Sequence, residues 1–113
     1  MPYIADNIAK LRRRHYIRNA TAANCWFDFA SNKVNDFVRR YGDDFCLVIN
    51  ASRELDDAYV IPYSIGRQVF TQVALDARGR WVGTILDSNL VLVPSHNSLR
   101  VASYHNAFKH FRL

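Results

Sequence analysis

The sequence is poor in cysteine, in glycine and in long apolar runs. Its two cysteines, Cys25 and Cys46, lie within apolar, strand-like segments and not in a spaced framework. This placement favours reduced core thiols in an intracellular protein, the alternatives being an isolated bridge or a reactive thiol. No apolar run approaches the roughly 18 residues that a membrane span needs, and residues 1–14 contain no uninterrupted apolar segment of a secretory signal. We therefore expect a cytoplasmic protein without a membrane partner.

The residues and patterns that most catalytic sites need are also scarce. Glutamate occurs once, at Glu54, and only four glycines are present, without a GxSxG pattern or a glycine-rich phosphate loop. The four histidines and two cysteines form no CxxC, HxxxH or HExxH spacing, which the common zinc sites require. A cysteine–histidine dyad would need an accessible thiol, whereas both cysteines fall in apolar runs. We therefore expect no metal, no cofactor and no catalytic residue in this chain.

A nuclease of the PD-(D/E)xK class is the enzymatic alternative. Its chemistry needs an acidic residue on one strand and a (D/E)xK sequence on the next, so that a metal ion and the lysine meet at one phosphate. No acid lies two positions before any lysine, and the nearest match is Asp76-Ala77-Arg78 in an expected loop. The pair Asp56-Asp57 has three interpretations: a solvated turn, a cation site or a cap. If the chain is catalytic, it is therefore a degenerate or divergent, metal-dependent endonuclease.

Positive charge is in excess and is carried mainly by arginine. The net charge is +5, with twelve arginines against three lysines, and nine of the ten acidic residues are aspartates. Arginine presents a planar fork of donors that fits phosphate and carboxylate groups. The excess therefore favours a polyanionic partner.

The patterning of apolar residues predicts one compact α+β domain over residues 1–113. Apolar positions at helical spacing predict helices over residues 3–18, 31–41, 64–70 and 104–111. Apolar, β-branched and aromatic runs predict strands over residues 25–30, 45–49, 58–61, 81–86 and 90–93, with a short extended piece at 99–101. The resulting order is α-β-α-β-β-α-β-β-α. We expect a single mixed, mostly antiparallel sheet of about five strands with helices packed on it.

The stretch from Asp43 to Ser64 is the centre of this predicted sheet. Phe45–Ile49 is an unbroken apolar run, so its strand should be buried on both faces. Ala58–Ile61 is the neighbouring strand and is closed by a proline. Further along the chain, Asp87-Ser88-Asn89 is typical of a hairpin turn.

The second predicted helix is the best marked in the sequence. Ser31 should cap its beginning, and Gly42 lies where a left-handed residue ends a helix. This helix should connect strands 25–30 and 45–49 as a crossover, which would allow them to pair in parallel. Asp28 interrupts the aromatic residues of the earlier strand, and we expect it on the solvent face of an edge strand, a buried carboxylate being the alternative.

Arginine clusters indicate where a polyanion would bind. Four arginines within seven residues of the first helix repel one another unless an anion is near, although a solvated helix face is the alternative. The run Arg78-Gly79-Arg80-Trp81 would grip phosphates and stack on a base, unless Trp81 anchors the core. Three aromatic residues are candidates for the lining of a pocket for an extruded base or, equally, for the core: Trp26, Tyr59 and Tyr63. The predicted nucleic-acid-binding residues are Arg12, Arg13, Arg14, Arg18, Arg67, Arg78, Arg80 and Trp81.

Two sequence segments carry a family resemblance. They are Asp57-Ala58-Tyr59-Val60-Ile61-Pro62-Tyr63, followed by a short helix to Phe70, and Arg78-Gly79-Arg80-Trp81-Val82-Gly83. The pattern resembles accessory domains of restriction-type endonucleases, in which a D-x-Y-V-I-P strand, a small helix and an R-W-x-G strand recur beside a nuclease module. The resemblance covers residues 26–93. It implies a DNA-recognition or scaffolding domain whose catalytic partner lies elsewhere, because this sequence lacks the nuclease motif.

These observations leave three hypotheses. The first is a DNA-binding domain of a restriction or defence nuclease system, which contacts the phosphates of double-stranded DNA through arginines and a base through an aromatic ring. The second is a non-catalytic interaction domain that forms a homodimer or docks on a nuclease module through an exposed edge strand. The third is the divergent nuclease described above.

Overall fold

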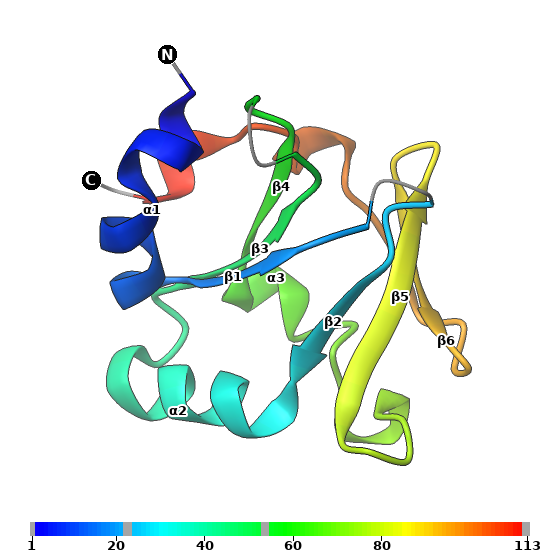
Figure 1. Cartoon of the computed structure of the whole chain (residues 1–113). Helices are drawn as coiled ribbons and strands as arrows, with labels where there is room; N and C mark the ends of the chain where they lie inside the picture. Colours follow the sequence, from blue (N-terminus) through cyan, green and yellow to red (C-terminus); the bar gives the residue numbers. More distant parts are fainter. Residues whose placement is uncertain (1, 22–23, 53–54, 112–113) are drawn as a thin grey trace.

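The structure is a computed structural model that describes residues 2–21, 24–52 and 55–111. Its strands form two sheets, where a single sheet of about five strands was expected (Figure 1). The first sheet has the order β1-β3-β4, with β1 at Tyr16–Asn19, β3 at Cys46–Asn50 and β4 at Ala58–Pro62. The second has the order β2-β5-β6-β7, at Phe27–Ala30, Arg80–Leu86, Asn89–Val93 and Ser98–Arg100. The fold is α+β, as predicted, and most strand pairs are antiparallel.

Helical segments complete the fold. The α-helices are α1 at Tyr3–Arg14, α2 at Ser31–Tyr41 and the single turn α3 at Tyr63–Gly66. Three short 3-10 helices follow: η1 at Gln72–Ala74, η2 at Ala102–Tyr104 and η3 at Phe108–Phe111. None of the helices over the described residues is both long and apolar enough to cross a membrane.

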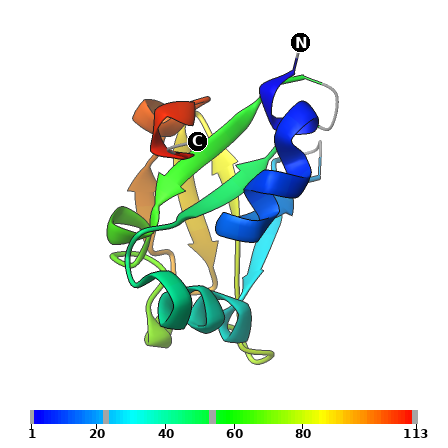
Figure 2. The same cartoon turned by 90° about the vertical axis from the view of Figure 1, so that its left-hand side faces the viewer.

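Strand β3 lies between two hydrophobic layers, as its unbroken apolar sequence predicted. All five of its residues are buried. Leu47 and Ile49 face the core shared with the second sheet, whereas Cys46 and Val48 face a second cluster beneath α1 and η3. Figure 2 shows the resulting layers, with α1 and the C-terminal turn on one side of β3 and β4 and with β5 and β6 on the other. The alternation of side chains along a strand explains this double burial.

The first helix ends earlier than predicted. Residues 16–19 form strand β1, which pairs in parallel with β3, so the expected helix over residues 3–18 is wrong in its last turn. Tyr16 and Ile17 are both buried, but they face the two different clusters, Tyr16 the core between the sheets and Ile17 the cluster beneath α1. Successive residues of a strand point to opposite faces. Pairing with β3 therefore outweighs the helical pattern.

The parallel pairing that the crossover would allow between strands 25–30 and 45–49 does not form. Strand β2 pairs antiparallel with β5, and β3 takes β1 as its parallel partner. Helix α2 therefore carries the chain from one sheet to the other. Gly42 ends this helix at a φ of 62°, as predicted, but no side chain caps its start, and the Ser31 amide instead donates to the Gly79 carbonyl.

The C-terminal third combines one confirmed prediction with one correction. Asp87 and Ser88, with φ of 50° and 62°, form the tight turn between β5 and β6 that the sequence predicted. The α-helix expected over residues 104–111 is wrong, because only short 3-10 turns form there. Asn106, at a φ of 51°, interrupts the helix, and its side chain binds Ala58 and Asp56 of the neighbouring segment.

The two adjacent aspartates after β3 have separate structural roles. The Asp56 carboxylate accepts hydrogen bonds from the backbone amides of Tyr3 and Ile4, at 2.8 and 3.1 Å, and so caps α1. Asp57 binds the His105 ring at 2.8 Å. Of the three interpretations of this pair, the structure supports the cap at Asp56. Glu54, the one glutamate, lies outside the described residues.

Candidate nucleic-acid interface

A three-residue ion network joins the edges of the two sheets. Arg18 on β1 donates to one oxygen of Asp28 on β2 at 2.7 Å, and Arg80 on β5 donates to the other at 2.5 Å. Arg18 also donates to the Asp28 backbone carbonyl. The Asp28 side chain is 29% exposed, so it lies in the seam between the sheets and not freely on a solvent face as expected.

The network favours the charged forms of Asp28 and Arg18. Burial alone would raise the pKa of Asp28, but the hydrogen bonds and charges of Arg18 and Arg80 together hold it below its usual value. The hydrogen bond to Asp28 in turn raises the pKa of Arg18. The carboxylate is therefore ionised at neutral pH, and two arginines around one aspartate leave one positive charge in excess.

Three more of the predicted arginines have acidic partners within the protein. Arg14 binds Asp44 at 2.8 Å, Arg67 binds Asp43 at 3.0 Å, and Arg78 binds Asp76 at 3.4 Å. Arg14 also lies over the ring of Tyr41, at 4.1 Å from its centroid. These ion pairs reduce the charge that each arginine can offer to a phosphate, although exposed pairs are weak enough to exchange.

Trp81 is a core residue and does not present its ring to a base. It is only 5% exposed, and its indole nitrogen donates to the Thr71 carbonyl at 2.8 Å. Its ring packs edge-on against Phe70. The expectation of a base contact at Trp81 is therefore wrong, and the alternative that this residue anchors the core is correct.

A basic groove lies where α1, β1 and α2 meet, and Arg12, Arg18 and Lys33 give it its charge. Its volume is about 320 Å³. The rest of its lining is formed by His15, Tyr16, Ile17 and Phe37. Over the described ranges, Arg12 and Lys33 form no ion pair, and Lys33 lies 6.0 Å from the ring of Tyr16. The groove thus contains two uncompensated cations beside the Arg18 network.

Contacts between the two helices hold the walls of the basic groove. The Tyr41 hydroxyl on α2 donates to the Arg13 carbonyl at the end of α1, at 3.0 Å. Tyr16 forms the floor, since its ring stacks on Phe37 and its hydroxyl accepts the Ala30 amide. The cations therefore project from a rigid scaffold, which lowers the conformational cost of binding an anion.

His15 lies beneath the basic groove as a neutral structural residue. Its Nδ1 accepts the Cys46 amide at 2.9 Å, so its Nε2 carries the proton and donates to the Phe111 carbonyl at 3.3 Å. Burial, the largest cause, lowers the pKa of His15 from 6.5 to about 4. His15 therefore adds no positive charge to the groove at neutral pH.

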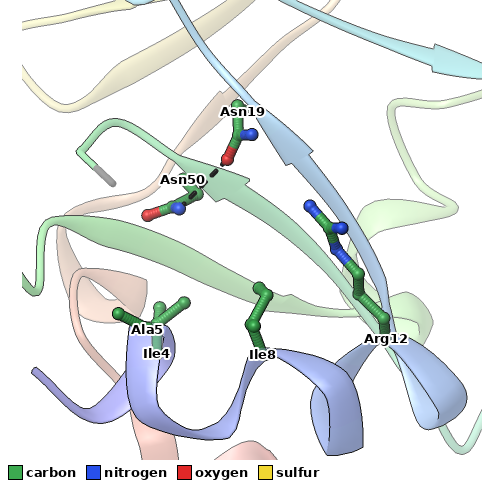
Figure 3. A pocket seen from close by; sticks show the side chains of 6 residues that line it. All are labelled: Ile4, Ala5, Ile8, Arg12, Asn19 and Asn50. Atoms are coloured by element: carbon green, nitrogen blue, oxygen red, sulfur yellow. Dashed lines mark hydrogen bonds between the residues drawn. The ribbon is translucent and has the colours of Figure 1, made fainter. Parts of the chain in front are cut away.

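An asparagine pocket adjoins the basic groove and shares Arg12 with it. It has a volume of about 380 Å³ and is lined by Ile4, Ala5, Ile8, Arg12, Asn19 and Asn50 (Figure 3). Asn19 and Asn50 end the parallel strands β1 and β3 at the same level, and the Asn50 amide donates to the Asn19 side-chain oxygen at 3.1 Å. Ligands bind preferentially at the carboxyl ends of parallel strands, which is the place of this pocket.

A third hollow continues from Asn19 toward the second sheet. It has a volume of about 270 Å³, and Trp26 and Arg78 lie in its lining with Asn19 and Asp28. The Trp26 side chain is 40% exposed, which makes it the accessible aromatic ring of this surface. Of the other aromatic candidates, Tyr59 packs on His105 and Tyr63 stacks on Phe45.

The structure therefore brings together part of the predicted set. Arg12 and Arg18 share the basic groove, and Arg78 lies in the hollow beyond Asn19. Arg13, Arg14 and Arg67 line none of these three spaces. Lys33, Asn19 and Asn50 were not predicted. Asn50 directly follows the apolar run Phe45–Ile49 and Asn19 follows Arg18, but their meeting depends on the parallel pairing of β1 with β3.

No grouping of three or more potential metal ligands occurs among residues 2–21, 24–52 and 55–111. Comparison with protein-family models, curated proteins and solved structures gives no match to the chain.

Proposed function

We propose that this chain is a DNA-binding domain that contacts the phosphates of a strand through the basic groove. The observation that carries the proposal is the meeting of Arg12, Arg18 and Lys33 from three different elements in one concave surface. Lysine and arginine that neutralise phosphates supply most of the affinity for DNA. The net charge of +5 adds long-range attraction for a polyanion.

The surface next to the basic groove suits a strand with accessible bases. The asparagine pocket supplies amide groups, and the hollow beyond it supplies the exposed Trp26 ring. Aromatic rings stack on bases, and side-chain amides form hydrogen bonds with their edges. In this arrangement phosphate contacts at Arg18 and base contacts at Asn19 follow one another along β1.

In this proposal the chain binds and does not cut. Both aspartates that a divergent nuclease would use are engaged within the protein, Asp56 by the backbone amides of Tyr3 and Ile4 and Asp57 by the His105 ring. A companion nuclease module, as the restriction-type resemblance implies, would supply the chemistry.

The test is DNA binding by matched charge variants. Fluorescence anisotropy with a labelled single strand and the corresponding duplex measures affinity over a salt series. We expect affinity that falls steeply with salt, and a greater loss for Arg12→Ala and Lys33→Ala than for Arg13→Ala. Arg13 is an exposed arginine of the same helix and lines none of the three spaces, so it is the control for loss of charge. Absence of binding to both DNA forms at low salt would contradict the proposal.

A docking or dimerisation domain is the second candidate, and an exposed apolar side chain favours it. Leu86, at the end of β5, is 56% exposed, and the short strand β7 forms an edge of the same sheet, with β6 between it and β5. An open edge can pair with a strand of another chain. Light scattering that shows a stable dimer, together with no affinity for DNA, would support this candidate.

A further inference from the structure

We propose that the asparagine pocket receives one unpaired base of the bound strand, a base with an exocyclic amino group such as adenine or cytosine. This inference rests on the proposed DNA binding, and it names the kind of base that the site recognises. The phosphate of the same nucleotide would bind Arg12, which belongs to both the asparagine pocket and the basic groove.

The polar end of the pocket has an acceptor without a donor. Asn50 is only 5% exposed, and its Nδ2 group donates to Asn19. Its Oδ1 atom is buried and has no hydrogen-bond partner among the described residues. Figure 3 shows that this oxygen points away from Asn19. A buried acceptor without a partner is unfavourable, so an N–H group of a ligand would relieve the cost.

The opposite side of the pocket is aliphatic. Ile4, Ala5 and Ile8 lie along one side of α1 and face the two asparagines across the space. Bases taken out of a stack are held between apolar side chains and are recognised by hydrogen bonds to their edges. An asparagine amide pairs well with adenine, whose amino group donates to the side-chain oxygen. Thymine lacks this amino group.

Two donor groups of the protein lie at the end of the pocket where the phosphate of the nucleotide would bind. The Arg12 guanidinium lies at the end of the pocket away from the Asn50 oxygen, and the Asn19 amide nitrogen is on the same side (Figure 3). Arg12 forms no ion pair in the part of the chain that the structure describes. One phosphate here and one base over Ile8 match the two ends of a nucleotide.

The test fills the pocket from its exposed side. Ala5 is exposed on α1, so Ala5→Trp should occlude the pocket without disturbing the core. Ala9→Trp, one turn along the same helix and also exposed, is the matched control. The probes are oligo(dT) strands that contain one central dA, one dC, one dT or one abasic position, and the readout is fluorescence anisotropy.

We expect a single dA or dC to tighten binding by the unmodified protein about tenfold over both the dT strand and the abasic strand. Ala5→Trp should abolish this preference and retain the salt-dependent binding of oligo(dT), whereas Ala9→Trp should retain both. Asn50→Leu should also lose the preference. If that variant fails to fold by circular dichroism, Ala5→Trp still decides the question.

Two results would overturn the inference in distinguishable ways. A preference that Ala5→Trp leaves intact, or no preference in the unmodified protein, would contradict the base pocket. Neither result would contradict the proposed DNA binding. No binding of any strand at low salt would remove the proposed function together with the pocket.

Discussion

Asp28 on β2 binds Arg18 on β1 at 2.7 Å, and this ion pair connects the edge strands of two different sheets. The second oxygen of Asp28 binds Arg80. One carboxylate therefore orders Arg18, which lines the basic groove, together with Arg80 on β5, and reduces their net charge. Neutralisation of Asp28 should therefore lower the stability of the protein and raise its affinity for DNA.

Asp28→Asn should lower the free energy of unfolding by about 1–3 kcal/mol, because it removes charge-assisted hydrogen bonds from a partly buried seam. The same change adds one positive charge beside the basic groove, so DNA should bind more tightly at low salt. Urea unfolding and anisotropy measure the two effects. Asp36→Asn is the control, since its ion pair with Arg39 is exposed on α2 and should contribute little. A loss of DNA affinity in folded Asp28→Asn would contradict the account.

Asp56→Ala should destabilise the protein through loss of the α1 cap. The expected loss is about 1–2 kcal/mol of unfolding free energy, and Asp56→Asn should lose less because asparagine also caps helices. Urea unfolding of these variants and of Asp57→Ala, whose partner is the exposed His105, checks the assignment. Equal stability of Asp56→Ala and the unmodified protein would show that the cap is not formed. Mg²⁺-dependent DNA cleavage that is lost in a folded Asp56→Ala would revive the nuclease hypothesis.

His15 should make stability fall in mild acid. Its pKa is about 4 in the folded protein, against an ordinary value of 6.5, so the unfolded chain binds more protons between these pH values. The free energy of unfolding should therefore fall as pH decreases through this window, by on the order of 3 kcal/mol in total. Protonation would break the bond from the Cys46 amide, and the nearby charges of Arg14 and Asp44 act in opposite directions.

Urea unfolding at pH 7.5, 6, 5 and 4.5 measures this dependence. His15→Gln removes the titrating group, so its curve over the same range should be flatter, whatever its absolute stability. Parallel curves for the two proteins would show that His15 is not the group responsible.

Gly83→Ala should lower the free energy of unfolding more than Gly42→Ala, although of these two glycines Gly42 is the one with a positive φ. A Cβ at Gly83 would overlap the Val91 carbonyl oxygen on the paired strand and press on Phe27. This overpacking should cost about 1–3 kcal/mol. Gly42 is surrounded by open space, so its substitution should cost only the backbone strain of about 1 kcal/mol. Thermal unfolding of both variants gives the comparison, and the reverse order would contradict the tight β5–β6 pairing.

The sequence predicted those parts of the fold that local patterns determine. The apolar run of β3, the hairpin turn at Asp87 and Ser88 and the end of α2 at Gly42 each follow from properties of consecutive residues. Strand β1 did not follow, because the helix predicted over residues 3–18 included Tyr16 and Ile17, which become a strand only by pairing with β3. The C-terminal turns did not follow either, since Asn106 is held by contacts with Ala58 and Asp56, 48 and 50 residues away.

The sequence predicted the chemical character of the candidate interface but not which residues form it. Composition indicated a polyanion-binding surface, but the pairing of Arg80 with Asp28 joins residues 52 positions apart and is not visible in the sequence. The sequence likewise did not indicate that the indole of Trp81 donates its hydrogen bond to the Thr71 carbonyl. Lys33 was assigned no role, and it enters the site because α2 packs beside the end of α1.

The salt dependence of single-stranded DNA binding tests the central claim most directly. The measurement compares the double variant Arg12→Ala/Lys33→Ala with Arg13→Ala/Lys109→Ala, which removes the same charge from exposed positions outside the three spaces. The account predicts that the slope of log affinity against log salt becomes shallower by about 1.4 for the groove variant, that is, about 0.7 for each lost phosphate contact, and stays unchanged for the control. Equal slopes for the two variants would contradict it.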